Sequence, residues 1–294
     1  MVALAALIAS VAVGGWQLGS IDEQSVPRAV VQASASVRIA VIDTGADLTV
    51  PELAARTVLT WDTRTGGANA RDTNGHGTFV ASVAAAYGGN ARLLILKAGD
   101  GGSFTDAAEA AAIRHAVVHG AKIVNLSVGG TTTSSTERAA IRFAVARGAL
   151  VVAAAGNEHG LGDPVEYPAA LLQPVGSNGT AGQGLVVGAS SPDGFRAAFS
   201  NTGSWISLVA PGVQVYGAVL HHGYGYGSGT SFATPQVAGA AALVWAADRN
   251  LTAQQVAGIL EETATGGGAW TPELGWGVID VGAAVARALQ LAVS

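Results

Sequence analysis

The sequence predicts an α/β domain of three layers, with a mainly parallel central sheet and helices on both of its faces. Two observations lead to this fold class. Short apolar, β-branched runs recur along the 294 residues, and segments with helical patterns and helix start signals lie between them. Continuous apolar runs are typical of strands buried on both faces, and alternation of strands with helices is the pattern of a parallel sheet.

The composition is consistent with one large domain. The chain is 49% hydrophobic and only 12% charged, which is ample for a sizeable core. The net charge of −5 and the absence of a basic patch argue against a nucleic-acid partner. There is no cysteine, which excludes disulfides and thiolate metal sites but leaves the cellular compartment open. No internal repeat or low-complexity linker divides the chain.

The N-terminal stretch has no charged side chain before Asp22. It is long enough to cross a bilayer, but it lacks the basic region with which a signal peptide begins. We interpret residues 1–15 as the remnant of a leader or pro-segment, in preference to a membrane anchor. Residues 16–294 are then the folded domain.

Six runs are predicted to form the buried parallel strands. In chain order they are VRIAVI (37–42), RLLILK (92–97), KIVNLSV (122–128), ALVVAAA (149–155), GLVVGAS (184–190) and ISLVA (206–210). Ligands bind at the carboxyl ends of the strands in such sheets. Polar residues that directly follow a strand are therefore the functional candidates.

The helices between the strands have recognisable start and stop signals. Capping boxes are predicted at Asp106 with Glu109, Ser134 with Glu137 and Thr252 with Gln255, and Gly120 and Gly148 are expected just after helix ends. In GTSFATP (229–235), the proline is tolerated only if it lies in the first helical turn, where backbone N–H groups have no intrahelical acceptor. This predicts a helix that begins close to Ser231.

Four polar residues combine into one catalytic pattern. Asp43 follows the first strand, Asn157 follows the fourth, and His76 and Ser231 each lie at a predicted helix start. Singly, each has an ordinary structural explanation: a turn, a surface histidine or a helix cap. Together they supply a nucleophile, its base, a carboxylate that orients the base, and a donor for an oxyanion. The order Asp, His, Ser is a known order for such triads.

The motifs that carry these residues resemble those of the subtilisin-like serine proteases (subtilases). VIDTGAD, NGHGTFVAS, AAAGNE and GTSFATPQVAGAAAL contain Asp43, His76, Asn157 and Ser231 respectively. The similarity runs over nearly the whole chain from Trp16. It implies a serine endopeptidase that works through an acyl-enzyme, with Asp43, His76 and Ser231 as the triad. Asn157 and the Ser231 N–H are then the oxyanion donors.

The resemblance also implies where a peptide would bind. Substrate-binding strands match Gly101, Gly102 and Ser103 and also Ser127, Val128 and Gly129, while Ala154, Ala155 and Gly156 line the specificity pocket. A substrate would add to these segments by β-pairing. Glu166 is expected at the pocket floor, where its carboxylate would favour arginine or lysine before the scissile bond. The alternative is an exposed loop whose acidic residues are only solvated.

The sequence departs from the family pattern where calcium is usually bound. The loop that wraps a high-affinity calcium ion in relatives is missing after Tyr87. We therefore expect no metal in the active site and no cofactor for catalysis, and the usual calcium site is expected to be absent. Asp62, Asp72 and Asn74 are candidates for a weaker calcium site. Glu52 alone cannot supply the six to eight oxygens that calcium takes.

The expected partners are polypeptide substrates and a pro-domain that is not in these residues, and the expected state is a monomer. A secreted or cell-surface location is expected, with a cytoplasmic one left open. Two other functions remain as alternatives: a transpeptidase or peptide cyclase with the same acyl-enzyme, and a non-catalytic binding protein on the same fold. A binding protein would be expected to have lost one of the four residues, and none is missing.

Overall fold

The computed structural model describes residues 16–101, 104–180, 182–221 and 223–293. The predicted leader remnant, residues 1–15, lies outside them.

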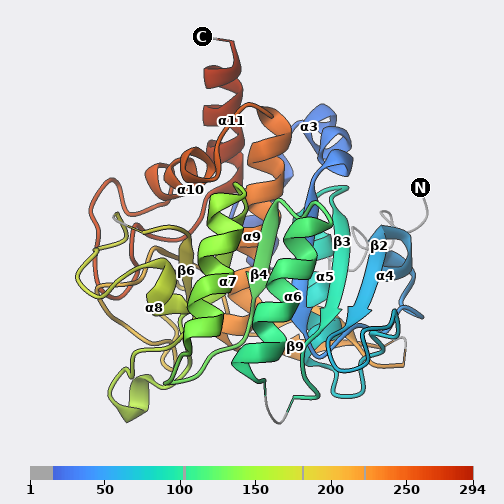
Figure 1. Cartoon of the computed structure of the whole chain (residues 1–294). Helices are drawn as coiled ribbons and strands as arrows, with labels where there is room; N and C mark the ends of the chain where they lie inside the picture. The colour runs from blue at the N-terminus through green and yellow to red at the C-terminus, as the bar shows by residue number, and fades with distance from the viewer. Residues whose placement is uncertain (1–15, 102–103, 181, 222, 294) are drawn as a thin grey trace.

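A seven-stranded parallel sheet forms the centre of the domain (Figure 1). Its order is β2-β3-β1-β4-β5-β6-β7, so the chain lays strands on both sides of β1. Such a reversal of strand order marks the position at which ligands bind in open α/β sheets. The strands are β1 (Arg38–Asp43), β2 (Thr57–Asp62), β3 (Arg92–Lys97), β4 (Ile123–Leu126), β5 (Leu150–Ala154), β6 (Leu185–Ser190) and β7 (Leu208–Pro211).

Helices cover both faces of this sheet. In Figure 1, α6 and α7 cross the near face, and α5 and α9 lie behind it. The helices are α2 (Trp16–Ser20), α3 (Arg28–Ala33), α4 (Pro51–Arg56), α5 (His76–Tyr87), α6 (Asp106–Val118), α7 (Ser135–Ala146), α8 (Ala169–Leu172), α9 (Thr230–Ala247), α10 (Ala253–Glu262) and α11 (Val281–Ala292), with short 3₁₀ turns η2 (Glu23–Ser25), η3 (Ser34–Ser36) and η4 (His159–Leu161). The predicted three-layer α/β fold is confirmed.

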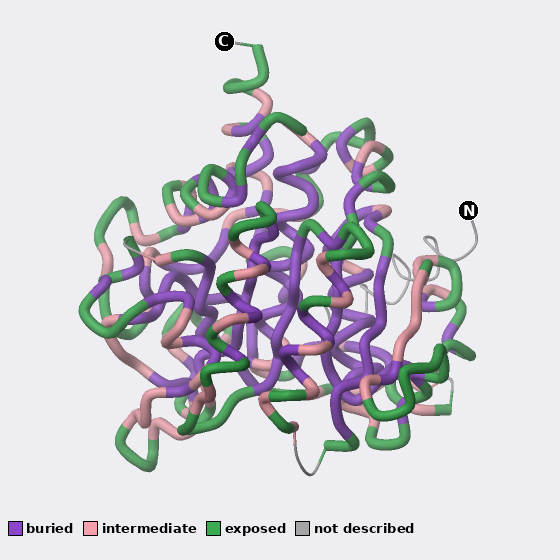
Figure 2. Tube along the Cα trace, in the orientation of Figure 1, coloured by how far each residue is buried: buried purple, intermediate pink, exposed green. Residues whose placement is uncertain are grey.

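Each face of the sheet has its own hydrophobic core, because successive side chains of a strand point to opposite faces. Ile39 and Val41 of β1 pack with α5, α9 and α11, whereas Ala40 and Ile42 pack with α6 and α7. Figure 2 shows the resulting buried interior, with exposed residues mainly in loops and on outer helix faces. The sheet is therefore a rigid platform whose carboxyl edge holds the polar candidates.

All six predicted strands are present, and three further strands are not in the prediction. β2 is an edge strand in which only Asp62 is buried, so it lacks the apolar run that marks the others. β8 (Val215–Val219) and β9 (Gly223–Gly227) form a separate antiparallel hairpin. Glycine alternates with tyrosine in β9, GYGYG, and glycine is normally unfavourable inside a strand.

Helix boundaries agree with the predicted signals in most places. Thr252 and Gln255 form the full reciprocal capping box, and Ser134 caps α7. The prediction at Asp106 is wrong by one residue: the Thr105 side chain accepts from the Ala108 N–H and is the N-cap of α6. Thr105 can do this because its backbone is extended, as an N-cap requires.

Two carboxylates are buried together between α6 and α7. Glu109 is 5% exposed and Glu137 is 2% exposed, and each has a carboxylate oxygen without a hydrogen-bond partner. Burial, the charge of Glu137 and the charge of Asp106 raise the pKa of Glu109 from 4.5 to about 8. Glu109 therefore stays protonated in the folded protein at pH values where the unfolded chain has already ionised.

Replacing Glu109 with glutamine should raise stability at alkaline pH. In the wild type, Glu109 does not destabilise the fold below about pH 4.5, where it is protonated in both states. As the pH rises toward 8, the free energy of unfolding falls, because only the unfolded state releases this proton in that window. We expect Glu109→Gln to melt several degrees higher near pH 8, at about 2–4 °C for each kcal/mol gained, and to match wild type near pH 4. Thermal unfolding with exposed Glu273→Gln as the control measures this; equal gains at both pH values would contradict it.

Candidate active site

Asp43 and His76 are in direct contact at the carboxyl edge of the sheet. Asp43 ends β1 and is fully buried, and His76 is the first residue of α5. The His76 Nδ1 lies 2.8 and 3.0 Å from the two carboxylate oxygens of Asp43. This contact orients the imidazole and leaves its other nitrogen, Nε2, as the one available for proton transfer.

The residue after Asp43 joins the two elements. The Thr44 Oγ1 accepts the Gly77 N–H at 2.8 Å, and the Thr44 carbonyl accepts from the buried Lys97 Nζ at 2.9 Å. Gly77 is required here, because a Cβ at this position would lie 2.2 Å from the Gly45 carbonyl oxygen. The end of β1 and the start of α5 are thus held at one spacing.

The surroundings of His76 favour its charged form. Burial opposes the imidazolium, but the charge of Asp43 and its hydrogen bond, with a contribution from Asp72, outweigh burial and raise the pKa of His76 above its ordinary value. A higher pKa makes the imidazole a stronger base.

Ser231 is the second residue of α9, and it forms a reciprocal pair with Ser127, which follows β4. The Ser231 hydroxyl donates to the Ser127 carbonyl at 3.2 Å, and the Ser127 hydroxyl donates to the Ser231 carbonyl at 2.8 Å. Pro235 explains the second bond: it lies four residues after Ser231 and has no N–H to give to that carbonyl. The helix begins at Thr230, close to Ser231 as predicted. The expectation that Pro235 lies in the first turn is wrong, and Ser127 replaces the donor that the proline lacks.

In this structure, the described contacts of the Ser231 hydroxyl do not include His76. The next residue along the chain, Phe232, does lie near His76: the centroids of the two rings are 5.6 Å apart. Catalytic hydrogen bonds are often long without substrate and tighten in the complex. The structure thus links Asp43 to His76, and it places Ser231 beside them with its hydroxyl turned to Ser127.

Asn157 lies next to the start of α9, with its amide orientation fixed by Thr230. Its Oδ1 accepts from the Thr230 N–H at 2.9 Å and from the Thr230 hydroxyl at 3.1 Å. A backbone N–H can only donate, so the atom that faces it must be the oxygen. The Nδ2 group of Asn157 therefore remains as the donor. The Ser231 N–H, in the first turn of α9, has no intrahelical acceptor, and it belongs to the residue directly after Thr230, which Asn157 contacts.

Most of the predicted substrate-binding residues belong to the described part of the chain, and they follow strands at the carboxyl edge of the sheet or lie near the start of α5. Ser127, Val128 and Gly129 follow β4, and Ser127 contacts Ser231. Ala154 ends β5, and Ala155 and Gly156 lead from it to Asn157. Gly101 has a φ of +89° and packs against Asn74. Gly102 and Ser103 lie outside the described residues.

Glu166 is buried, unlike a solvated loop residue. It is 6% exposed, and a Cβ on Gly129 would lie 2.8 Å from its Oε2. A Cβ on Gly156 would lie 2.7 Å from its Cγ. Burial and the charge of Glu158 raise the pKa of Glu166. The alternative in which this acid is only solvated is wrong for Glu166, because Gly129 and Gly156 pack directly against its side chain.

Of the three residues considered for a weaker calcium site, Asp72 is engaged by donors of the protein itself. Asp72 uses both of its oxygens to cap α5: they accept the N–H groups of Asn74, Gly75 and Thr78 and the Thr78 hydroxyl. The carboxylate of Glu52 accepts from the Tyr224 hydroxyl at 2.6 Å. Within the described ranges, no group of three or more histidine and acidic residues is arranged to hold a metal ion.

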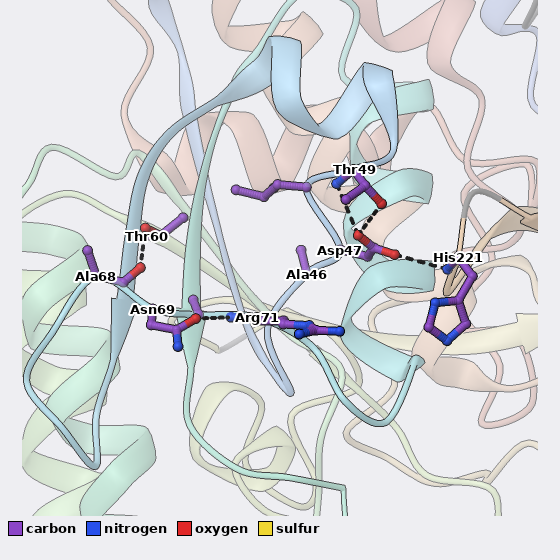
Figure 3. Close-up of a pocket in the computed structure, with 10 residues that line it drawn as sticks. Ala46, Asp47, Thr49, Thr60, Ala68, Asn69, Arg71 and His221 are labelled. Carbon is purple, nitrogen blue, oxygen red and sulfur yellow. Dashed lines mark hydrogen bonds between the residues drawn. The ribbon is translucent and has the colours of Figure 1, made fainter.

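A hollow of about 640 Å³ begins three residues after Asp43 in the chain, at Ala46 (Figure 3). Its lining comes from residues 46–49, 60, 68–71 and 221. Figure 3 shows Asp47 accepting from Thr49 and from the His221 N–H, with the Arg71 side chain extending toward His221. His221, which precedes the serine motif in the chain, therefore lies at this hollow.

Sequence reasoning did not single out two residues that position the candidate groups. Thr44 ties β1 to α5, and Thr230 orients Asn157. The sequence contained a signal for both, because each is a hydroxyl residue directly adjacent to a candidate, Asp43 in one case and Ser231 in the other. Their roles depend on contacts between segments that are distant in the chain.

Comparison with known proteins identifies the family. The family model described as "Subtilase family" matches residues 34–277. A thermophilic serine proteinase from Bacillus sp. (strain AK1) is 37% identical over 234 residues, which is 75% of this chain and 55% of that protein. Thermitase from Thermoactinomyces vulgaris is 34% identical over 245 residues, which is 80% of this chain and 83% of thermitase.

A solved structure agrees with the sequence comparison. A protease structure from Pseudoalteromonas arctica PAMC 21717 has a TM-score of 0.74 and 28% identity, and the match covers 90% of this chain and 94% of that one. Among the helices described, none is long and apolar enough to cross a membrane. The chain belongs to the subtilase family, the subtilisin-like serine proteases.

Proposed function

We propose that this chain hydrolyses internal peptide bonds of polypeptides through an acyl-enzyme formed on Ser231. The observation that carries the proposal is the 2.8 Å contact between Asp43 and His76, with Ser231 at the adjacent N-terminus of α9. The match covers only 55% of the length of the Bacillus proteinase. The activity of that relative is therefore not transferred to this chain, and the activity of this chain is part of the proposal.

The proposed reaction has two halves. Ser231 Oγ attacks the scissile carbonyl while His76 Nε2 accepts its proton, and Asp43 stabilises the imidazolium. Asn157 Nδ2 and the Ser231 N–H donate to the oxyanion. The C–N bond then breaks and the leaving amine takes the proton from His76. Water attacks the acyl-enzyme by the same route, with His76 as base, and releases the carboxylic acid and free Ser231.

Cleavage of a peptide library, with and without a serine-directed phosphonate, tests this function. We expect hydrolysis products with new carboxyl termini, and loss of all cleavage when the phosphonate has labelled Ser231. Mass spectrometry of the products separates hydrolysis from peptide transfer or cyclisation. Cleavage that persists in fully labelled protein would contradict the proposal.

Chelation should leave both activity and stability unchanged. The loop after Tyr87 is short, and Asp72 and Glu52 are occupied by internal donors. A bound ion at a hundredfold its Kd would add about 2.7 kcal/mol, or roughly 5–10 °C in Tm. We expect Tm in EDTA to match Tm in added calcium, by calorimetry. A fall of that size in EDTA, reversed by calcium, would show that a high-affinity site exists.

A secreted or cell-surface location, a pro-domain outside these residues and a monomeric state remain part of the proposal. A folding assay with and without an added family pro-domain, and sedimentation of the purified chain, address the last two.

A further inference from the structure

Glu166 is a buried residue with no cation beside its carboxylate. The residue is 6% exposed, and among the described residues its carboxylate has no hydrogen bond and no ion pair, although its oxygens are not fully buried. The segment is held in place by its neighbour, because the Tyr167 N–H and carbonyl pair with the Gly130 carbonyl and N–H at 2.8 and 3.0 Å. A carboxylate that is largely withdrawn from water without a partner is destabilising, and pairing with a cation would offset that cost.

The carboxylate lies where two backbone segments come together. Gly129 follows β4 and Gly156 follows β5, and a Cβ on either one would collide with the Glu166 side chain, at 2.8 and 2.7 Å. The same two segments continue to Ser127, which contacts Ser231, and to Asn157, which contacts Thr230. Glu166 therefore packs against the two segments that carry Ser127, a contact of the candidate nucleophile, and Asn157, the candidate oxyanion donor.

A second acid makes this place more negative. Glu158 Oε2 would lie 2.7 Å from a Cβ on Gly156, and it already accepts from the Asn157 N–H at 2.6 Å and from the Asn201 Nδ2 at 3.3 Å. Glu158 is thus held in position by two donors, whereas Glu166 has none. A cationic side chain that entered beside Gly129 and Gly156 would find one carboxylate unpaired and a second one near it.

We propose that Glu166 selects an arginine or lysine side chain on the residue that supplies the scissile carbonyl. The inference rests on the proposed peptidase function. A guanidinium can form a charge-assisted, bidentate pair with the carboxylate. An apolar side chain would remove the remaining water from Glu166 and give nothing in return.

Matched peptides that differ only at this residue test the selection. The residue is arginine, its neutral isostere citrulline, lysine, phenylalanine or leucine, and kcat/KM is measured for wild type, Glu166→Gln and Glu166→Asp. In the wild type, we expect arginine to exceed citrulline by about 10- to 100-fold, the size of one charged hydrogen bond. The ratio should fall to near one in Glu166→Gln and recover in part in Glu166→Asp. Glu273→Gln, an exposed acid replaced in the same way, should keep the wild-type ratio.

Two results would overturn the selection: phenylalanine or leucine preferred over arginine in the wild type, or an arginine-to-citrulline ratio unaffected by Glu166→Gln. Labelling by a serine-directed phosphonate, counted on the same samples, separates this failure from failure of the peptidase function. Calorimetric binding of the arginine and citrulline peptides to Ser231→Ala decides the case without turnover. Equal affinities there would also refute the role of Glu166.

Discussion

Replacing Ser231 with alanine should lower kcat by about 10⁶-fold, a magnitude carried over from the equivalent substitution in subtilisin. The fold should be unchanged, because the Ser231 hydroxyl makes one described hydrogen bond, to the Ser127 carbonyl, and is not part of either hydrophobic core. The Ser231 carbonyl keeps its bond from the Ser127 hydroxyl. Steady-state cleavage of a peptide substrate gives the rate, and circular dichroism and Tm report the fold.

The control for this loss is Ser135→Ala, which removes a hydroxyl at the first residue of α7, away from the candidate site, and should keep full activity. Residual cleavage in Ser231→Ala must also be tested with the phosphonate, because a trace of wild-type enzyme is inhibited by it. Activity near the wild-type level in a phosphonate-resistant Ser231→Ala preparation would exclude Ser231 as the nucleophile.

Replacing Asn157 with alanine should lower kcat by about 10²–10³-fold and change KM little, again by analogy with an oxyanion donor in subtilisin. The physical reason is that the Asn157 oxygen is occupied by Thr230, which leaves the Nδ2 hydrogens to face charge that develops only in the transition state. Asn157→Asp keeps the size of the side chain but has no donor, so it should lose at least as much.

The variant Thr230→Val separates the positioning of Asn157 by Thr230 from the donation of a hydrogen bond by Asn157 itself. It removes the hydroxyl bond to Asn157 Oδ1 but leaves the backbone N–H bond of 2.9 Å, so we expect a smaller fall in kcat, below about tenfold for one neutral hydrogen bond. If Asn157→Ala instead raises KM and leaves kcat unchanged, Asn157 binds the ground state and is not an oxyanion donor.

The parts of the fold that sequence predicts are those with a local signal. The strand of β1 is apolar from Ile39 to Ile42 and ends in Asp43, so both its burial and the position of the carboxylate at the carboxyl end of the strand follow from its own residues. β2 mixes threonine, valine and tryptophan at a sheet edge, and its pairing with β3 is a tertiary contact that no local pattern announces. The tyrosines of β9 are likewise stabilised by pairing with β8.

The candidate site divides in the same way. The residue types and their motifs identify Asp43, His76, Asn157 and Ser231, because the proposed chemistry needs those side chains. Sequence could not show that both oxygens of Asp72 are occupied by donors at the start of α5, since an acid two residues before NGHG is equally typical of a metal ligand and of a helix cap. Nor could it show the burial of Glu166, which depends on how closely Gly129 and Gly156 pack against it.

The bond from the Ser127 hydroxyl to the Ser231 carbonyl constrains how this family member can evolve. With proline at 235, loss of the Ser127 hydroxyl would leave that carbonyl without its donor, at a cost of roughly 1–3 kcal/mol if water does not replace it. A residue with an N–H at 235 would provide a donor from within α9, and position 127 could then vary. The order of the two substitutions therefore matters: a lineage that changes Pro235 first passes through a stable intermediate, and one that changes Ser127 first does not.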